Sequence, residues 1–136
     1  MRLWHYKLIP FLPDLQLVAQ WRELNEIYQN RPNHILINYV YVWSDDNLHD
    51  YSDMVIAELK RRGHSIKLGR YDKYFADKPY SDIYIKGRPY ALIHDDRYLL
   101  QNFYNLQEKY DRGQRGFHDE EYRKLEEFVK GETDGR

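Results

Sequence analysis

The chain has 136 residues, which is long enough for one domain with its own core. It has no cysteine, and this absence excludes disulfides and thiolate metal sites. Its 21 basic and 22 acidic residues give a formal net charge of −1, which does not favour a protein that coats DNA through global positive charge, although a local basic groove is compatible with it. No apolar run approaches the roughly 18 residues of a membrane-spanning helix, and Pro10, Pro13 and Asp14 interrupt any signal-peptide pattern. We therefore expect a cytoplasmic protein without membrane attachment.

The N-terminal segment is unusually apolar and aromatic for a chain end. Its apolar side chains are Leu3, Trp4, Tyr6, Leu8, Ile9, Phe11 and Leu12. Chain ends usually fray, so this composition predicts that the terminus packs against the core. A helix should follow from Asp14, which can cap it after Pro13, to Gln29.

The expected helix over 14–29 has an apolar stripe and a polar flank. The stripe consists of Leu17, Trp21, Leu24 and Tyr28, which recur at helical spacing. Gln16, Gln20, Glu23 and Ile27 lie together on the neighbouring flank, by the same 3.6-residue period. Glu23 is therefore predicted at the edge of the buried face, in polar company.

The segment Ile35 to Trp43 is rich in Ile, Val and Tyr, which locally indicates a strand. A lone strand leaves its edges unsatisfied. The segment either pairs with another short strand or is a buried connector, and the residues leave both open.

Three further helices are expected. They run from Leu48 to Arg62, from Asp95 to Arg112 and from Asp119 to Lys130, and stop at Gly63, Gly113 and Gly131. Their expected core residues are Leu48, Val55 and Leu59; Leu99, Phe103, Leu106 and Tyr110; and Leu125, Phe128 and Val129. The predicted fold is mainly α, with about four helices, long loops and little or no β structure. We expect one domain over 1–130 and a disordered tail over 131–136.

A loop is expected from Ile66 to Arg88, and it interleaves basic and aromatic residues. The basic ones include Lys67, Arg70, Lys86 and Arg88, and the aromatic ones include Tyr71, Tyr74, Phe75, Tyr80 and Tyr84. Such a stretch can contact a polyanion by charge and by base stacking. It can equally be a solvated loop whose tyrosines fill a small core with their hydroxyls near water.

Two acidic clusters resemble metal ligands but fit helix starts better. His94-Asp95-Asp96 and His118-Asp119-Glu120-Glu121 each stand where a helix should begin. Acids in the first turn are ordinary caps and complements of the helix dipole, and neither cluster has a second His at i+4. We therefore predict no metal site, and no Gly-rich phosphate loop or nucleophile motif is present either.

The opening Met1-Arg2-Leu3-Trp4-His5, with Leu8-Ile9-Pro10 and Leu12-Pro13 behind it, resembles the start of the bacterial and phage pyrimidine-dimer DNA glycosylases of the endonuclease V type. The segment 16–24, which contains Arg22-Glu23, is similar to that family's helix bearing an Arg-Glu pair. The likeness continues through Asn33-His34, Tyr39-Val40 and the helix 54–63, and covers about residues 1–112.

This resemblance implies a compact helical repair enzyme that acts on damaged double-stranded DNA without metal or organic cofactor. In that family the N-terminal α-amine attacks the sugar at the damaged nucleotide, displaces the base and leaves an imine, and β-elimination then cuts the strand. Met1 and Glu23 would be the catalytic residues here. Arg2, Gln16 and Arg22 would contact DNA, as would Lys67, Arg70, Lys86 and Arg88, and we expect a monomer.

The chain departs from the phage pattern at several positions. Arg2 is bulky, so we expect Met1 to be retained and its α-amine to be the nucleophile. Glu26 and Gln16 stand where the phage enzyme has Arg and His, which reduces the expected DNA contacts.

Other functions fit the same residues. A glycosylase for another modified base would share the imine chemistry. A module that kept the fold without the lyase would bind nucleic acid in a salt-dependent way, and a protein-interaction domain would bind none.

Overall fold

The computed structural model describes residues 1–134, which form five α-helices and two short 3-10 helices. In chain order these are η1 (Tyr6–Phe11), α1 (Asp14–Asn30), η2 (Asn38–Tyr41), α2 (Asp45–Arg61), α3 (Gly69–Phe75), α4 (Asp96–Asp111) and α5 (Asp119–Thr133). No strand occurs in this described part of the chain. The expectation of a mainly α fold is therefore confirmed, with one α-helix more than the four predicted.

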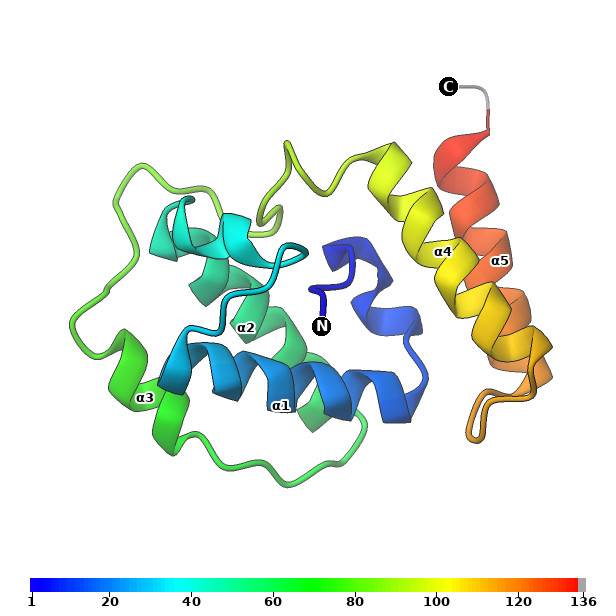
Figure 1. Ribbon diagram of the computed structural model, residues 1–136, viewed down its shortest axis with the longest axis horizontal. Coiled ribbons are helices and arrows are strands. Elements are labelled where there is room, and N and C mark those ends of the chain that lie inside the picture. The colour runs from blue at the N-terminus through cyan, green and yellow to red at the C-terminus, as the bar shows by residue number, and fades with distance from the viewer. Residues whose placement is uncertain (135–136) are drawn as a thin grey trace.

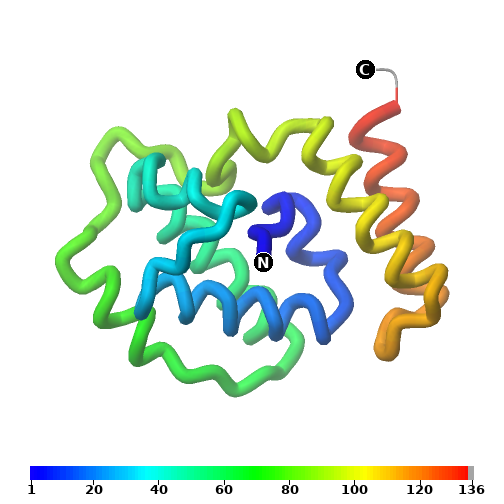
Figure 2. The backbone as a smooth tube through the Cα atoms, in the orientation of Figure 1, coloured from blue at the N-terminus to red at the C-terminus, as the bar shows by residue number. Residues whose placement is uncertain are grey.

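The helices surround the N-terminal segment. Helix α1 packs against α2 and α3, α4 pairs with α5, and η1 lies between α2 and α5 (Figure 1). The backbone trace shows the N-terminus at the centre of this view, beside the middle of α1, and the C-terminal end of α5 at the periphery (Figure 2). Leu3, Leu8 and Ile9 are almost completely buried, because the apolar run at the start of the chain forms part of the core.

The long helices begin and end close to the predicted positions. All four residues of the α1 stripe are buried, as are Leu48, Val55 and Leu59 on α2. Gly63 and Gly113 follow α2 and α4 with φ of +87° and +75°, a conformation that glycine adopts without strain. Asp95 caps α4 by accepting a hydrogen bond from the Tyr98 N–H.

Asp14 does not cap α1, contrary to expectation. Pro13 is the N-cap and no side chain caps it. The Asp14 carboxylate instead accepts hydrogen bonds from Arg62 and lies 2.9 Å from His64 Nε2. Burial disfavours the ionised Asp14 carboxyl, but the hydrogen bonds from Arg62 and His64 outweigh it and lower its pKa.

The interpretation of Ile35 to Trp43 as a strand is wrong. The segment folds into a turn and η2, and its backbone closes on itself through bonds such as Val40 N–H to Ile37 O (2.9 Å). Residues 1–134 contain no strand with which this segment could pair, so local i→i+3 hydrogen bonds satisfy its backbone groups instead. Ile37 and Val40 point into the core, while Val42 is 84% exposed.

The expected loop over 66–88 contains helix α3, which sequence periodicity missed. Seven residues give only two turns, too short for an apolar stripe to stand out. The aromatic residues here hold the chain to α2. Tyr80 donates to Asp53 (2.7 Å), Tyr84 donates to Asp50 (2.8 Å), and His49 of α2 stacks between Phe75 and Tyr80.

Helix α5 continues past Gly131, where the sequence predicted its end. It runs to Thr133, and Glu132 accepts a hydrogen bond from Lys7 Nζ at 2.8 Å. The predicted disordered tail over 131–136 therefore begins with helical residues, and positions 135–136 lie outside the described residues.

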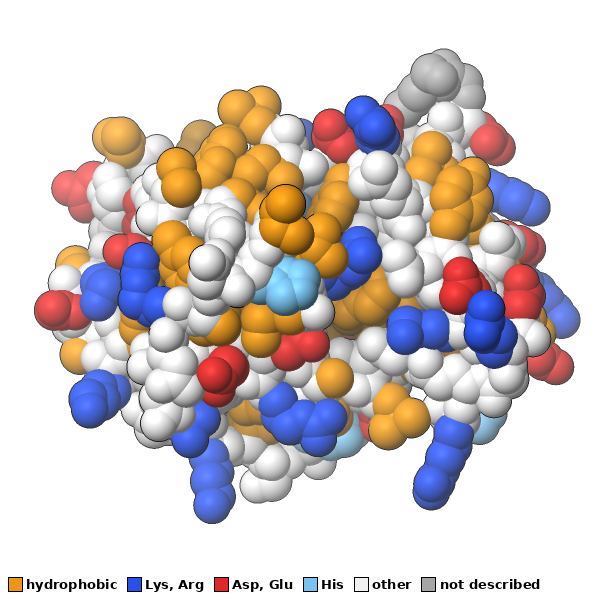
Figure 3. Space-filling model, in the orientation of Figure 1, with side chains coloured by type: hydrophobic (Ala, Val, Ile, Leu, Met, Phe, Trp, Pro, Cys, Tyr) orange, Lys and Arg blue, Asp and Glu red, His pale blue; other side chains and the backbone are white. Residues whose placement is uncertain are grey.

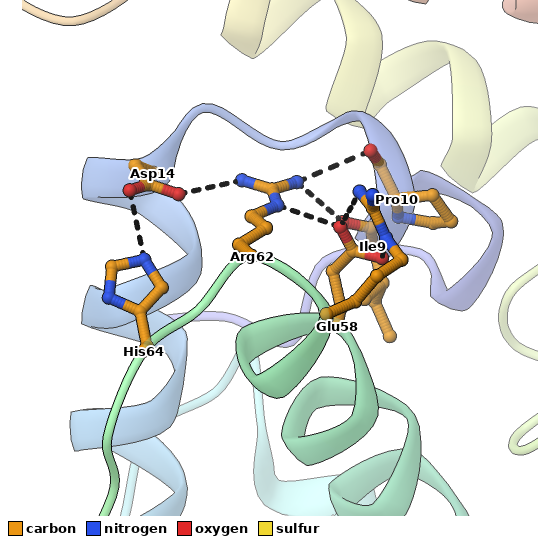
Figure 4. Close-up of polar contacts among 7 residues, drawn as sticks. Ile9, Pro10, Asp14, Glu58, Arg62 and His64 are labelled. Atoms are coloured by element: carbon orange, nitrogen blue, oxygen red, sulfur yellow. Dashed lines mark hydrogen bonds and ion pairs between the residues drawn. The ribbon is translucent and has the colours of Figure 1, made fainter.

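Arg62 joins three elements at the end of α2 (Figure 4). Its guanidinium donates to Asp14 of α1 (3.0 Å), to Glu58 of α2 (2.7 Å) and to the Pro10 carbonyl of η1 (3.2 Å). Burial opposes ionisation of Glu58, but hydrogen bonds from Arg61 and Arg62 outweigh it and hold the pKa of that carboxyl below its ordinary value. Arg62 therefore fixes the corner between η1 and α1.

Within residues 1–134, no helix is both long and apolar enough to cross a membrane.

Candidate active site

The backbone of residues 2–6 is held by side chains from three helices and the loop before α4. Three backbone carbonyls accept hydrogen bonds from side chains: Arg2 O from Gln20 Nε2, Leu3 O from the Tyr98 hydroxyl and Trp4 O from the Tyr51 hydroxyl. Three backbone N–H groups donate to side chains: Trp4 to Gln20 Oε1, His5 to Asn102 Oδ1 and Tyr6 to His94 Nδ1. Buried backbone groups need such partners. The chain end is consequently fixed in one conformation, in contrast to an ordinary frayed terminus.

Gln20 is the central partner in this set. Its side chain is completely buried, and its Nε2 donates to Arg2 O (3.0 Å) and to Glu23 Oε2 (3.1 Å). Its Oε1 accepts from Trp4 N–H (2.9 Å) and lies 2.8 Å from the Tyr51 hydroxyl. One amide group therefore links the N-terminal backbone, α1 and α2.

Glu23 lies beside the amino-terminal charge. Burial raises the pKa of its carboxyl above the ordinary value, while the N-terminal charge, a hydrogen bond from the Arg2 backbone and the charge of Arg22 act in the opposite direction. The side chain is neither fully buried nor freely solvated. Such a carboxyl exchanges protons more readily near neutral pH than an exposed glutamate does.

A pocket of about 180 Å³ opens over these groups. Its lining residues are Met1, Arg2, Trp4, Gln16, Ala19, Gln20, Glu23, Asn105 and Lys109. The structure thus brings together the two predicted catalytic residues, Met1 and Glu23, and two of the predicted DNA contacts, Arg2 and Gln16.

The remaining predicted contact near the pocket is Arg22, an exposed residue next to Glu23 in the chain whose charge acts on the Glu23 carboxyl. The Arg2 guanidinium lies 5.7 Å from the centre of the Trp4 ring, and Gln16 Nε2 donates to Gln114 Oε1. Arg2 therefore supplies one cation to the pocket lining, which does not include Arg22.

Sequence reasoning missed Asn105 and Lys109. They are four residues apart and lie on one face of α4, but no feature of the sequence links α4 to the N-terminus. Lys109 has no ion-pair partner in the described part of the chain, whereas the neighbouring Glu108 pairs with Arg112. Lys109 therefore contributes a further cation beside Met1.

Four other predicted DNA contacts do not line this pocket. Arg70 borders a separate pocket with Tyr28 and Asp77, and Arg88 borders a third with His94. Lys86 lies 4.0 Å from the centre of the Tyr80 ring, and Lys67 is exposed. The tyrosines of this region donate to carboxylates of α2, so the basic-aromatic stretch is not a free stacking surface.

The buried histidines are structural partners of the N-terminal segment. His94 Nδ1 accepts from the Tyr6 N–H, and its Nε2 lies 2.9 Å from the Tyr39 hydroxyl. Burial lowers the pKa of His94 well below its usual value and that of His5 to about 4, so both rings are neutral near pH 7. No group of three or more metal-ligating side chains occurs within residues 1–134.

The charges on the face that carries the N-terminus are mixed. Figure 3 shows Lys and Arg side chains scattered over this face with Asp and Glu between them. This pattern agrees with the near-zero net charge. Binding of a polyanion here would depend on a few placed cations, because no broad basic field is present.

Comparison with known proteins gives one match. The family model described as pyrimidine dimer DNA glycosylase matches residues 1–72, which is just over half of the chain. No curated protein and no solved structure matches. The matched segment includes Met1, Gln20, Glu23 and Tyr51, whereas α4 and α5 lie beyond it.

Proposed function

The chain belongs to the pyrimidine dimer DNA glycosylase family, and on this premise we propose that it excises a base at a pyrimidine dimer in duplex DNA and then cuts the strand as an AP lyase. The observation that carries the proposal is the partly buried Glu23 carboxyl beside the amino-terminal charge of a fixed chain end. An amine and a carboxyl at one small pocket are the groups that imine chemistry at a sugar requires.

The Met1 α-amine is the proposed nucleophile. It attacks C1′ of the damaged nucleotide and forms a C1′–N bond as the glycosidic bond breaks. The base leaves with the electron pair of that bond and takes up a proton. Loss of the amine proton and opening of the sugar ring give the imine. A fixed backbone reduces the entropy that the attack must overcome.

Glu23 is the proposed proton-transfer residue. As a carboxylate it stabilises the positive charge that develops on the sugar when the base leaves. It also accepts or relays the proton lost from C2′ before the C3′–O bond breaks in β-elimination. Its hydrogen bond from Gln20 keeps one carboxylate oxygen oriented during these steps.

The DNA contacts we propose fall into two groups. Arg2, Gln16 and Lys109 line the pocket, and Arg22 is exposed next to Glu23 in the chain. These four residues hold the phosphates that flank the lesion. Lys67, Arg70, Lys86 and Arg88 are exposed outside it and contact the duplex farther from the lesion.

A cleavage assay on defined duplexes tests the proposed function. The substrates carry one thymine dimer, one abasic site, one different modified base, or no lesion. We expect cleavage at the dimer and at the abasic site, and none of the undamaged duplex. Cleavage of the abasic and modified-base duplexes alone would identify another glycosylase specificity. Binding without cleavage of any duplex would contradict the proposal.

A further inference from the structure

The geometry assigns Gln20 a positioning role: we propose that its side-chain amide sets the distance between the Met1 amine and the Glu23 carboxyl. This inference rests on the proposed function of the same pocket. Gln20 touches neither DNA nor the reacting atoms in this scheme, and acts through the two groups that do.

Both N–H donors and the oxygen of the Gln20 amide are engaged. A glutamine amide offers two N–H donors and two oxygen lone pairs. The donors reach Arg2 O and Glu23 Oε2, and the oxygen accepts from the Trp4 N–H. The single proton of the Tyr51 hydroxyl lies within hydrogen-bond distance of both Gln20 Oε1 and Trp4 O. A fully engaged amide has one orientation, so both groups that it holds are fixed relative to each other.

The two donor bonds connect the proposed nucleophile to the proposed proton-transfer residue, in addition to the hydrogen bond that the Arg2 backbone makes to Glu23. Arg2 O belongs to the residue that follows Met1, so the bond at 3.0 Å restricts where the α-amine lies. The bond at 3.1 Å restricts one oxygen of Glu23. No other side chain within residues 1–134 donates a hydrogen bond to both Glu23 and the backbone of residues 1–6.

Position 20 requires an amide for this role. A carboxylate has no N–H, so it cannot bond to Arg2 O or Glu23, and it would add a second negative charge beside Glu23. A like charge raises the pKa of a neighbouring carboxyl. Gln20→Glu keeps the size of the side chain, so it changes only the hydrogen-bond donors and the charge at this position.

Tyr51 anchors the amide from the opposite side. Its ring is completely buried and its hydroxyl lies 2.7 Å from Trp4 O and 2.8 Å from Gln20 Oε1. Tyr51→Phe removes that hydroxyl alone and leaves the donors of Gln20 in place. Its effect on catalysis should therefore be in the same direction and smaller.

The test compares Gln20→Glu, Tyr51→Phe and the control Gln29→Glu with the unaltered protein. Gln29 is an exposed glutamine at the far end of the same helix. For each variant, circular dichroism checks folding, the affinity for an abasic duplex is measured, and single-turnover cleavage of that duplex is followed across pH. We expect Gln20→Glu to slow cleavage about 100-fold and Tyr51→Phe to slow it about tenfold, with little change in affinity.

The pH profile distinguishes positioning from a general structural role. In Gln20→Glu the acidic limb of the profile should move to higher pH, because the Glu23 pKa rises, while Gln29→Glu should leave it unchanged. Folded Gln20→Glu and Tyr51→Phe variants with unaltered rates and profiles would overturn the inference. If Gln20→Glu does not fold, the rate of Tyr51→Phe decides. Failure of the unaltered protein to cleave the abasic duplex would instead overturn the proposed function.

Discussion

Burial of Glu23 has opposite consequences for chemistry and for stability. The raised pKa places its proton exchange closer to neutral pH, which suits an acid–base catalyst. The same burial makes the ionised form costly in the folded state. Neither consequence follows from the residue type alone, because both depend on the N-terminal segment that covers this flank of α1.

Glu23→Gln should abolish most of the activity while preserving DNA binding. The change keeps the shape of the side chain but removes proton transfer, which contributes about 10²- to 10⁴-fold to such reactions. Single-turnover cleavage and a binding titration on the same abasic duplex measure the two effects. Glu26→Gln, one turn along α1, is the matched control, because Glu26 only accepts a hydrogen bond from Asn30. Equal losses in both variants would contradict the role of Glu23.

Glu23→Gln should also raise the melting temperature at neutral pH. A carboxyl whose pKa is raised on folding contributes stability below its unfolded pKa, and that stability is lost as the pH rises through the folded pKa. The difference between variant and unaltered protein should therefore be present at pH 7 and shrink toward pH 4. Melting curves across this range check the sign. A variant that is less stable at pH 7 would show that the attraction of the Glu23 carboxylate to the amino-terminal charge outweighs the cost of its burial.

The lining of the pocket was predictable from sequence at the chain end and along α1, but not on α4. Helical spacing places Gln16, Gln20 and Glu23 on one flank, and the structure confirms that these side chains line one pocket. The hydrogen bonds from Gln20 to the backbone of Arg2 and Trp4 could not be predicted, because side chain-to-backbone contacts depend on how the two segments pack.

At the scale of elements, α2 packs against α1 and also holds η1 and α1 through a side chain at its C-terminal end. Basic residues in the last turn of a helix commonly complement its dipole. Arg62 instead bonds to η1 and α1 and is only 17% exposed, whereas Arg61 is 66% exposed and pairs with Glu58 alone. The sequence does not distinguish these adjacent arginines, because the difference arises from the segment that packs on one side of the helix.

Arg62→Ala should lower the free energy of unfolding by about 1–3 kcal/mol. It leaves the Pro10 carbonyl and the Asp14 carboxylate without their shared donor. Chemical denaturation measures the change, and Arg61→Ala serves as the control with little expected effect, because exposed ion pairs contribute little. Similar losses in both variants would mean that Arg62 does not fix the corner between η1 and α1.

Helix α4 supplies the part of the pocket that the family match does not include. Lys109→Ala should weaken binding to every duplex to a similar extent and reduce the salt dependence of the affinity by about one counterion. Titrations at several salt concentrations measure both. Lys124→Ala on α5, which removes an equal charge from a lysine paired with Glu120, should leave the salt slope unchanged. An unchanged slope for Lys109→Ala would remove it from the DNA interface.

At the scale of the whole molecule, the N-terminal segment connects the two halves of the fold. Residues 2–6 bond to α1 and α2 on one side and to Tyr98 and Asn102 of α4 on the other. The number and positions of the long helices followed from apolar periodicity. Their arrangement around the chain end did not, because periodicity gives the buried face of a helix without identifying what covers it.

We predict that residues 1–130 unfold as one cooperative unit. The three tryptophans, Trp4, Trp21 and Trp43, all lie in the first third of the chain, whereas circular dichroism also reports on α4 and α5. Because the N-terminal segment joins both halves, thermal curves from tryptophan fluorescence and circular dichroism should coincide. Two separated transitions would show that α4 and α5 unfold independently.

A borohydride trap on an abasic duplex, mapped by mass spectrometry, tests most directly whether the Met1 α-amine is the nucleophile. Reduction converts an imine between protein and sugar into a stable amine, and peptide mapping identifies the nitrogen. We predict one adduct, on the α-amine of Met1, that disappears when the terminus is blocked and persists when lysines alone are altered. An adduct on a lysine, or none from protein with a confirmed intact terminus, would contradict the account.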